Sequence, residues 1–354
     1  MSILLLIAVF PAYGRVDKNN PPLFKSLVFD KGDGGSKFYR IPALTVTPDG
    51  GVIAVADRRW DDLSDLPGHI DVVCRRSDDG GRTWGATVTV AATDSAGGYG
   101  DPAIGVDPIS GDLVCVMTHG NGLWESTPGD NTHVVVCRSS DGGATWTSPS
   151  DISYIFPSDA VAAFASSGAL TVTKDGRMMF VLVVRDSLKK WSKLKDYAVW
   201  STDGGHTWQA SPQAADDDGD EAKIVETADG NLLMSIRNRR KGAHKFSVST
   251  DGGVSWSAPR LCDDIIEPAC NGDIVRLTAG RLLLTVPANA TQRRDVTLYA
   301  SDDNGTTWQA ERLLCPAPSA YSSIAVMPDG SVGALIEEGA SDGGFRIWFS
   351  VYEL

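Results

Sequence analysis

An eight-residue pattern that recurs five times constrains the fold of this chain more than any other feature. Its copies read SDDGGRTW, SSDGGATW, STDGGHTW, STDGGVSW and SDDNGTTW, and they end at Trp84, Trp146, Trp208, Trp256 and Trp308. Successive tryptophans are 62, 62, 48 and 52 residues apart. A period of about 50 residues is the size of one four-stranded blade of a β-propeller.

The chemistry of the pattern suits a turn between two strands. The aspartate in its third position, such as Asp79, can accept hydrogen bonds from nearby backbone N–H groups. The glycine two positions later tolerates positive φ, and the tryptophan supplies a large apolar surface for packing. We call this pattern the Asp box and interpret its residues as structural.

The segments around the Asp boxes read as strands. VVCRRS, HVVVCRS, YAVWS, KFSVS and VTLYAS precede the five boxes, and all are rich in β-branched or aromatic residues. A second turn signal, seen in TPDGG, TKDG, TADG and MPDG, introduces further apolar runs. The sequence predicts an all-β fold, a six-bladed β-propeller of four-stranded antiparallel blades whose last blade pairs the two ends of the chain. Without a linker between repeats, residues 15–354 are expected to form a single propeller domain.

Charge and hydropathy restrict the partners. The formal net charge of −13 argues against nucleic acid and anionic membrane surfaces, because both require a positive field. Residues 1–14, MSILLLIAVFPAYG, fit either a signal segment or a first strand. We expect a secreted or periplasmic protein, although a cytoplasmic location stays open, and no later run reaches the roughly 20 apolar residues of a membrane span.

The cysteines and histidines do not indicate a metal site. The six cysteines lack Cys-x-x-Cys spacing, and the five histidines do not cluster with them. We expect most cysteines to be buried, and a Cys262–Cys270 disulfide stays open if the protein is exported. No metal and no organic cofactor is expected.

The segment KFYRIPALTV around Arg40 resembles the sialidase (neuraminidase) family, which combines a Phe/Tyr-Arg-Ile-Pro segment with Asp boxes. The similarity runs from about Lys37 to Glu338. It implies a bacterial-type exo-α-sialidase in which three arginines, here Arg40, Arg237 and Arg293, bind the substrate carboxylate. Guanidinium groups suit this task because they donate paired hydrogen bonds and keep their charge. Adjacent strand residues point to opposite faces, so Arg294 competes with Arg293.

The resemblance also implies the catalytic groups. Asp65 in DLPG resembles the acid/base of the family's mobile loop, with Asp61 and Asp62 as competitors on sequence alone. Tyr321 in SAYSS resembles the nucleophile of a retaining mechanism, and Glu221 in DGDEAK resembles its base. A phenol ionises near pH 10, so it needs a carboxylate to accept its proton during attack.

Four more residues follow from the resemblance. Arg59 and Asp101 are expected to contact the substrate, and Trp124 is expected to line the side of the leaving group. Glu337 is expected to orient Arg40 through an ion pair, with Glu338 as the alternative.

The expected substrates are sialylated glycoproteins, glycolipids or oligosaccharides. A trans-sialidase or an intramolecular trans-sialidase would use the same residues, and the carboxylate clamp would equally serve a hydrolase of another ulosonic acid. A non-catalytic glycan-binding propeller would share the Asp boxes but would have no use for Tyr321, Glu221 and Asp65 together. The sequence indicates neither a linkage preference nor an oligomeric state.

Overall fold

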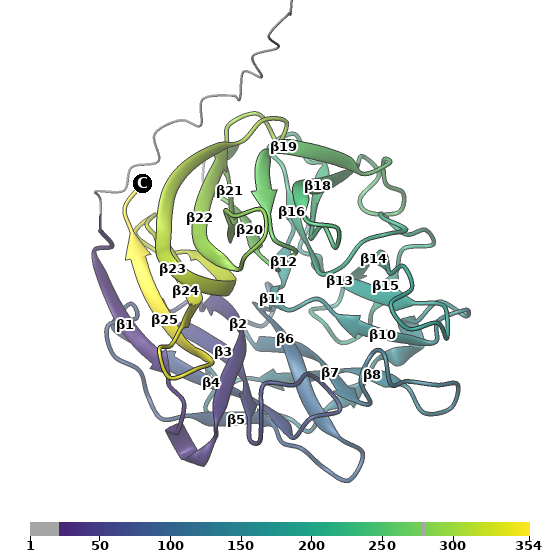
Figure 1. The fold of residues 1–354 in the computed structure, drawn as a ribbon, viewed down its shortest axis with the longest axis horizontal. Coiled ribbons are helices and arrows are strands. Elements are labelled where there is room, and N and C mark those ends of the chain that lie inside the picture. The colour runs from purple at the N-terminus through teal and green to yellow at the C-terminus, as the bar shows by residue number, and fades with distance from the viewer. Residues whose placement is uncertain (1–20, 278–279) are drawn as a thin grey trace, which may run out of the picture.

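The computed structural model describes residues 21–277 and 280–354, and this part of the chain is built almost entirely of antiparallel β-sheets arranged around a centre (Figure 1). The segment 1–14, which we interpreted as a signal segment or a first strand, lies outside the described residues. The two helical segments in the described part are short 3₁₀ turns, Asp33–Gly35 and Ser153–Ile155. No helix there is long and apolar enough to span a membrane.

Four of the sheets follow one another along the chain. The first contains β2 (Phe38–Val46), β3 (Val52–Arg59), β4 (Ile70–Ser77) and β5 (Val88–Ala91). The second contains β6 (Gly98–Val106), β7 (Leu113–Gly120), β8 (Thr132–Ser139), β9 (Ser150–Asp151) and the short β11 (Gly168–Ala169), which runs parallel to β6. The third contains β10 (Ala162–Ala165), β12 (Thr171–Val172), β13 (Met178–Arg185), β14 (Lys195–Ser201) and β15 (Gln209–Ala210). The fourth contains β16 (Ala222–Glu226), β17 (Leu232–Ile236), β18 (Gly242–Ser249) and β19 (Arg260–Glu267).

The remaining strands form one seven-stranded sheet. Its order is β1 (Phe24–Phe29), β25 (Phe345–Tyr352), β24 (Val332–Gly339), β23 (Gln309–Val326), β22 (Arg294–Ser301), β21 (Leu282–Pro287) and β20 (Asp273–Arg276). The long strand β23 pairs with β22 up to Pro318 and with β24 from Ser319 onward. Strand β1 pairs antiparallel with β25, which confirms the expected pairing of the two chain ends.

The hydrophobic core lies between neighbouring sheets. One cluster of buried side chains joins Val55 and Val72 of the first sheet to Ile104 and Met117 of the second, and comparable clusters join the next pairs of sheets around the ring. A further cluster lies between the two halves of the seven-stranded sheet. All six cysteines are buried and free, so the Cys262–Cys270 disulfide that the sequence left open is not formed. They pack as small apolar residues.

The Asp boxes begin where the third strand of a sheet ends. In the second copy, Ser139 Oγ donates to Asp141 Oδ1 (2.8 Å) and accepts from the backbone N–H of Gly143 (2.8 Å). Thr145 donates its backbone N–H to Asp141 Oδ1 (2.9 Å) and its hydroxyl to Oδ2 (2.6 Å). The other four copies repeat these bonds. Each box is therefore a self-bonded turn, as its composition predicted.

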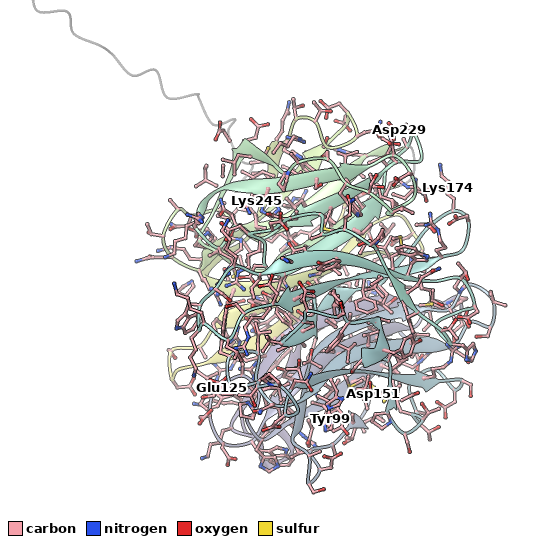
Figure 2. All side chains as sticks on the ribbon, turned by 90° about the vertical axis from the view of Figure 1, so that its right-hand side faces the viewer. Tyr99, Glu125, Asp151, Lys174, Asp229 and Lys245 are labelled. Carbon is pink, nitrogen blue, oxygen red and sulfur yellow. The ribbon has the colours of Figure 1, made fainter. Side chains whose placement is uncertain are left out.

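The Asp boxes and the x-Asp-Gly turns lie on the face opposite the loops that carry the site described below. Lys174 and Asp229, both in turns of the x-Asp-Gly type, lie toward one side of the molecule, while Glu125 lies toward the other (Figure 2). Antiparallel strands alternate in direction, so successive connections alternate between two faces of the molecule.

We predict that Asp141→Ala lowers the melting temperature by about 2 °C or more, because the turn loses its internal acceptor. The hydrogen bond from Thr145 lowers the pKa of Asp141 to about 2. Because the folded pKa lies below the unfolded one, this contribution to stability is present above the unfolded pKa and is lost as the pH falls through about 2. Calorimetry at pH 7 and at pH 2 checks both statements. The exposed Asp263 serves as a control: a shift in Asp263→Ala as large as that in Asp141→Ala would contradict the assignment.

Candidate active site

A cavity of about 700 Å³ lies on the face of the molecule opposite the Asp boxes. Six of the residues singled out in the sequence line it: Asp65, Asp101, Trp124, Glu221, Arg237 and Tyr321. The fold thus brings residues from the first, second, fourth and last sheets together at one place.

Tyr321, Glu221 and Arg237 form a hydrogen-bonded group on one wall of the cavity. The Tyr321 hydroxyl donates to Glu221 Oε2 (2.6 Å). Arg237 Nη1 donates to the same carboxylate oxygen (2.5 Å) and to the Tyr321 oxygen (3.1 Å). Glu221 directly precedes β16, Arg237 directly follows β17, and their register in this hairpin lets the two side chains meet.

The surroundings of Tyr321 keep its phenol protonated in the free protein. Burial raises the pKa of Tyr321 well above its ordinary value, and the neighbouring Glu221 carboxylate adds to the increase. Arg237 and Arg293 act in the opposite direction. A phenol in this position reacts as a nucleophile only if its proton leaves during the attack, and the carboxylate at 2.6 Å is placed to accept it.

Arg40 is held by a buried carboxylate. Arg40 Nε and Nη2 donate to Glu337 Oε1 (2.7 Å) and Oε2 (3.1 Å), and the Glu337 side chain is fully buried. Burial lowers the pKa of Arg40, but Glu337 outweighs it and the net shift is upward. The same carboxylate accepts the backbone N–H groups of Ile41 (2.8 Å) and Tyr321 (3.1 Å). Glu338 instead forms a half-exposed pair with Lys25, so Glu337 is the residue that orients Arg40.

Arg293 rather than Arg294 faces Tyr321. The Arg293 guanidinium lies 5.6 Å from the centre of the Tyr321 ring, and Arg40 lies 5.4 Å from it. Arg294 points away and pairs with Asp295 (2.8 Å). Three guanidinium groups, those of Arg40, Arg237 and Arg293, therefore converge on Tyr321, although their contact with a ligand stays a prediction.

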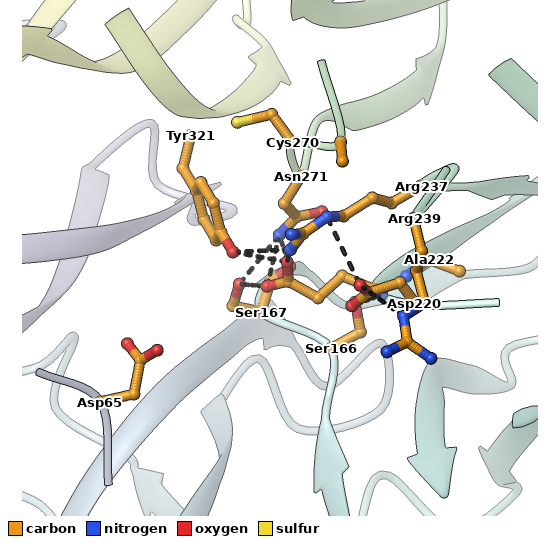
Figure 3. Close-up of polar contacts among 12 residues, drawn as sticks. Asp65, Ser166, Ser167, Asp220, Ala222, Arg237, Arg239, Cys270, Asn271 and Tyr321 are labelled. Atoms are coloured by element: carbon orange, nitrogen blue, oxygen red, sulfur yellow. Dashed lines mark hydrogen bonds and ion pairs between the residues drawn. The ribbon is translucent and has the colours of Figure 1, made fainter. Parts of the chain in front are cut away.

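Asp65 lies on the other side of the cavity, on the loop between β3 and β4. Its carboxylate is turned toward Tyr321 across an open space (Figure 3), and its side chain is 78% exposed. Arg59 Nη2 donates to Asp65 (2.8 Å) and to the buried Asp57 (2.9 Å), and Arg59 Nη1 donates to the Leu63 carbonyl (2.5 Å). Arg59 thus holds this loop, and its expected contact with a substrate stays a prediction. Burial raises the pKa of Asp57 to about 6 although Arg59 acts in the opposite direction.

Irregular hydrogen-bond pairing in strands β2 and β6 turns residues of both strands toward the site. The ladder between β2 and β3 is interrupted from Arg40 to Ala43, and the ladder between β6 and β7 from Gly100 to Ala103. Ile41 and Asp101 adopt positive φ (56° and 54°) at these interruptions, and each precedes a proline, which has no N–H for the ladder. Such bulges redirect side chains near active sites. Burial, together with the charges of Asp57 and Asp65, raises the pKa of Asp101 well above its ordinary value.

An aromatic pair borders the cavity beyond Asp65. The rings of Trp124 and Trp191 lie 5.0 Å apart, and the Arg239 guanidinium lies 5.8 Å from the Trp124 ring. Trp191 is 74% exposed.

Several residues of the site carried no signal in the sequence. Asn271 Nδ2 donates to Glu221 Oε1 (3.2 Å) and to Ser167 Oγ (3.0 Å), yet both Asn271 and Ser167 lie in irregular segments without a motif. Asp57 was detectable, because it lies two residues before Arg59 in a strand and so on the same face. In the described residues, no three or more His, Cys, Asp or Glu side chains are placed to hold a metal ion.

Comparisons with known proteins agree with this geometry. The family profile described as a BNR repeat-like domain matches residues 60–334, and the chain belongs to this family. Curated relatives named sialidase include one from Micromonospora viridifaciens, 34% identical over 87% of this chain and 51% of the relative. Another, from Bacteroides fragilis (strain YCH46), is 28% identical over 86% of this chain and 61% of the relative. The chain thus spans about half to three fifths of the length of these relatives.

Solved structures extend the likeness. The Hadza microbial sialidase Hz136 aligns with a TM-score of 0.84 at 27% identity, and the alignment covers 94% of this chain and 68% of the Hz136 chain. The intramolecular trans-sialidase from Ruminococcus gnavus aligns with a TM-score of 0.80 at 17% identity, and the alignment covers 93% of this chain and 97% of the trans-sialidase chain. The second match concerns the fold alone.

We predict that Glu337→Gln lowers the free energy of unfolding by about 3 kcal/mol, because it leaves the buried Arg40 charge without its counter-ion. Glu338→Gln, at the partly exposed neighbouring position, should change it by less than about 1 kcal/mol. Urea unfolding of the two variants measures the difference. Equal effects would mean that the Arg40–Glu337 pair does not carry this stability.

Proposed function

We propose that this chain is an exo-α-sialidase that hydrolyses terminal sialic acids from glycoconjugates with retention of configuration. The observation that carries the proposal is the 2.6 Å hydrogen bond from Tyr321 to Glu221, with three guanidinium groups close to Tyr321 and Asp65 across the cavity. The relatives named sialidase support it. The expected partners are sialylated glycoproteins, glycolipids and oligosaccharides.

The charge distribution fits an anionic sugar. A sialic acid carries a carboxylate on its anomeric carbon, and Arg40, Arg237 and Arg293 offer it paired hydrogen bonds and positive charge. An anionic nucleophile would be repelled by that carboxylate, whereas the protonated Tyr321 phenol is neutral. The net charge of −13 does not oppose binding, because exposed charges beyond about 8–10 Å are largely screened at physiological salt.

The reaction would proceed in two displacements. Tyr321 Oη attacks the anomeric carbon and passes its proton to Glu221, while Asp65 protonates the departing glycosidic oxygen. The covalent glycosyl-tyrosine then reacts with water, which gives a proton to Asp65, and Tyr321 leaves by recovering its proton from Glu221. Two inversions give net retention.

The proposal includes the six-bladed architecture. The seven-stranded sheet would count as two blades that share β23, one formed by β20, β21, β22 and the first part of β23, the other by the rest of β23 with β24, β25 and β1. With the other four sheets this makes six blades. The clusters of buried side chains between successive sheets support this count.

The experiment follows release of methylumbelliferone and of sialic acid from their α-sialosides. We predict that Tyr321→Phe lowers kcat by at least about 10²-fold, because the nucleophile is removed. Tyr99→Phe serves as the matched control, since Tyr99 donates to Asp94 (2.8 Å) outside the cavity. Unchanged turnover in Tyr321→Phe would contradict the assignment.

Asp65→Ala tests the acid on the facing loop. We predict a loss of about 10²- to 10⁴-fold with a natural sialoside and a smaller loss with the aryl substrate, whose leaving group needs less protonation. Asp61→Ala should leave both rates unchanged, because Asp61 pairs with His69 (3.3 Å) on the exposed part of the loop. Product analysis distinguishes hydrolysis from transfer. If the folded protein binds sialic acid but releases none, the glycan-binding alternative is favoured.

A further inference from the structure

A lysine is buried beneath the proposed nucleophile and its base, where the mechanism gives it no role. Lys223 lies in β16, two residues after Glu221, and is 5% exposed. Its Nζ atom donates to Asn271 Oδ1 (2.9 Å) and to Ser166 Oγ (3.1 Å). An ammonium group is costly to bury, so a lysine in this position calls for an explanation.

The hydrogen bonds of Asn271 connect this lysine to the base. While Asn271 Oδ1 accepts from Lys223, Asn271 Nδ2 donates to Glu221 Oε1 (3.2 Å) and to Ser167 Oγ (3.0 Å). The other Glu221 oxygen, Oε2, accepts from Tyr321. The two carboxylate oxygens thus have separate partners: Oε1 accepts from the buried Asn271 and from Ser167, whereas Oε2 accepts from Tyr321 and Arg237, which line the cavity.

Lys223 determines which way the Asn271 amide faces. An ammonium group only donates hydrogen bonds, so it requires the amide oxygen on its side and thereby turns the amide nitrogen toward Glu221. Without that donor the amide could turn over and present its oxygen to the Glu221 carboxylate, where two acceptors repel each other.

The backbone around Lys223 is shaped to keep it in place. A Cβ atom on Gly168 would lie 2.6 Å from Lys223 Cε, so β11 approaches the lysine as closely as only glycine allows. Ser166 Oγ, which accepts from Lys223, also accepts the backbone N–H of Ala222 (2.9 Å). The ammonium group is therefore confined between β11, β16 and Asn271.

We propose that Lys223 and Asn271 are positioning residues that hold the Glu221 carboxylate in line with the Tyr321 hydroxyl. The inference rests on the proposed function, since it assigns Glu221 as the base of a tyrosine nucleophile. Lys223 acts on Glu221 through the Asn271 amide.

The test compares Lys223→Met and Asn271→Asp with the wild-type chain on an α-sialoside. Both changes remove the donor that faces Glu221, the first indirectly and the second directly. We expect kcat to fall about 10-fold or more in each, a part of the roughly 10²- to 10⁴-fold that a positioned proton acceptor supplies. The Kd for free sialic acid, measured by calorimetry, should change by less than about twofold, because Arg40, Arg237 and Arg293 are untouched.

Two further variants separate positioning from a general loss of structure. Lys223→Gln keeps an N–H donor toward Asn271 and should recover most of kcat. Lys195→Met removes a partly buried lysine that pairs with Asp186 (2.6 Å) instead of with Asn271, and it should leave kcat unchanged. If Lys223→Met does not fold, Asn271→Asp carries the test, because an aspartate side chain has nearly the same shape as the asparagine that it replaces.

The outcomes are distinct. A kcat within twofold of wild type in folded Lys223→Met and Asn271→Asp overturns the inference and leaves the proposed function intact. A parallel weakening of sialic acid binding and kcat also overturns it, because the residues would then act on binding. A wild-type chain without activity on any sialoside overturns the proposed function and the inference together.

Discussion

The buried pair between Arg40 and Glu337 joins parts of the chain that lie nearly 300 residues apart in sequence. One carboxylate binds the Arg40 guanidinium and the backbone N–H groups of Ile41 and Tyr321. It therefore links β2 of the first sheet to β23 and β24 of the last, and it fixes an arginine and the tyrosine in one arrangement. A buried charge is tolerable only with a partner and further hydrogen bonds, and Glu337 has all of these.

Most of the fold could be predicted because its signals are local. The five Asp boxes are hydrogen-bonded within themselves, and the strands that precede them end at the first residue of each box. The pairing of β1 with β25 followed from the need to close a ring. The sharing of β23 between two partners was not predictable, because Pro316 and Pro318 in LLCPAPSAY favour a break in the chain rather than one continuous strand whose pairing changes.

The residues of the candidate site also divide into those that the sequence could predict and those that it could not. Arg40 and Tyr321 lie in recognisable segments, and alternation along β24 explains why Glu337 rather than Glu338 points inward. Arg293 precedes β22, so strand alternation does not decide between it and Arg294. The expected contact of Arg59 with a ligand stays a prediction. That its nitrogens also hold the loop of Asp65 could not be predicted, because this relation depends on how the loop folds back. The role of Asn271 could not be predicted from the sequence for a similar reason. Its neighbours Ser167 and Glu221 come from other sheets, and nothing in a linear sequence records that approach.

The turns and the cavity occupy opposite faces of the molecule. The self-bonded Asp boxes lie on one face, while the polar groups proposed to meet a ligand surround the cavity on the other. Mutations on one face therefore have few shared partners with those on the other, and distant sites without shared partners tend to act additively. The turn face accordingly offers points for attaching a tag or a solid support without obstructing the cavity on the opposite face.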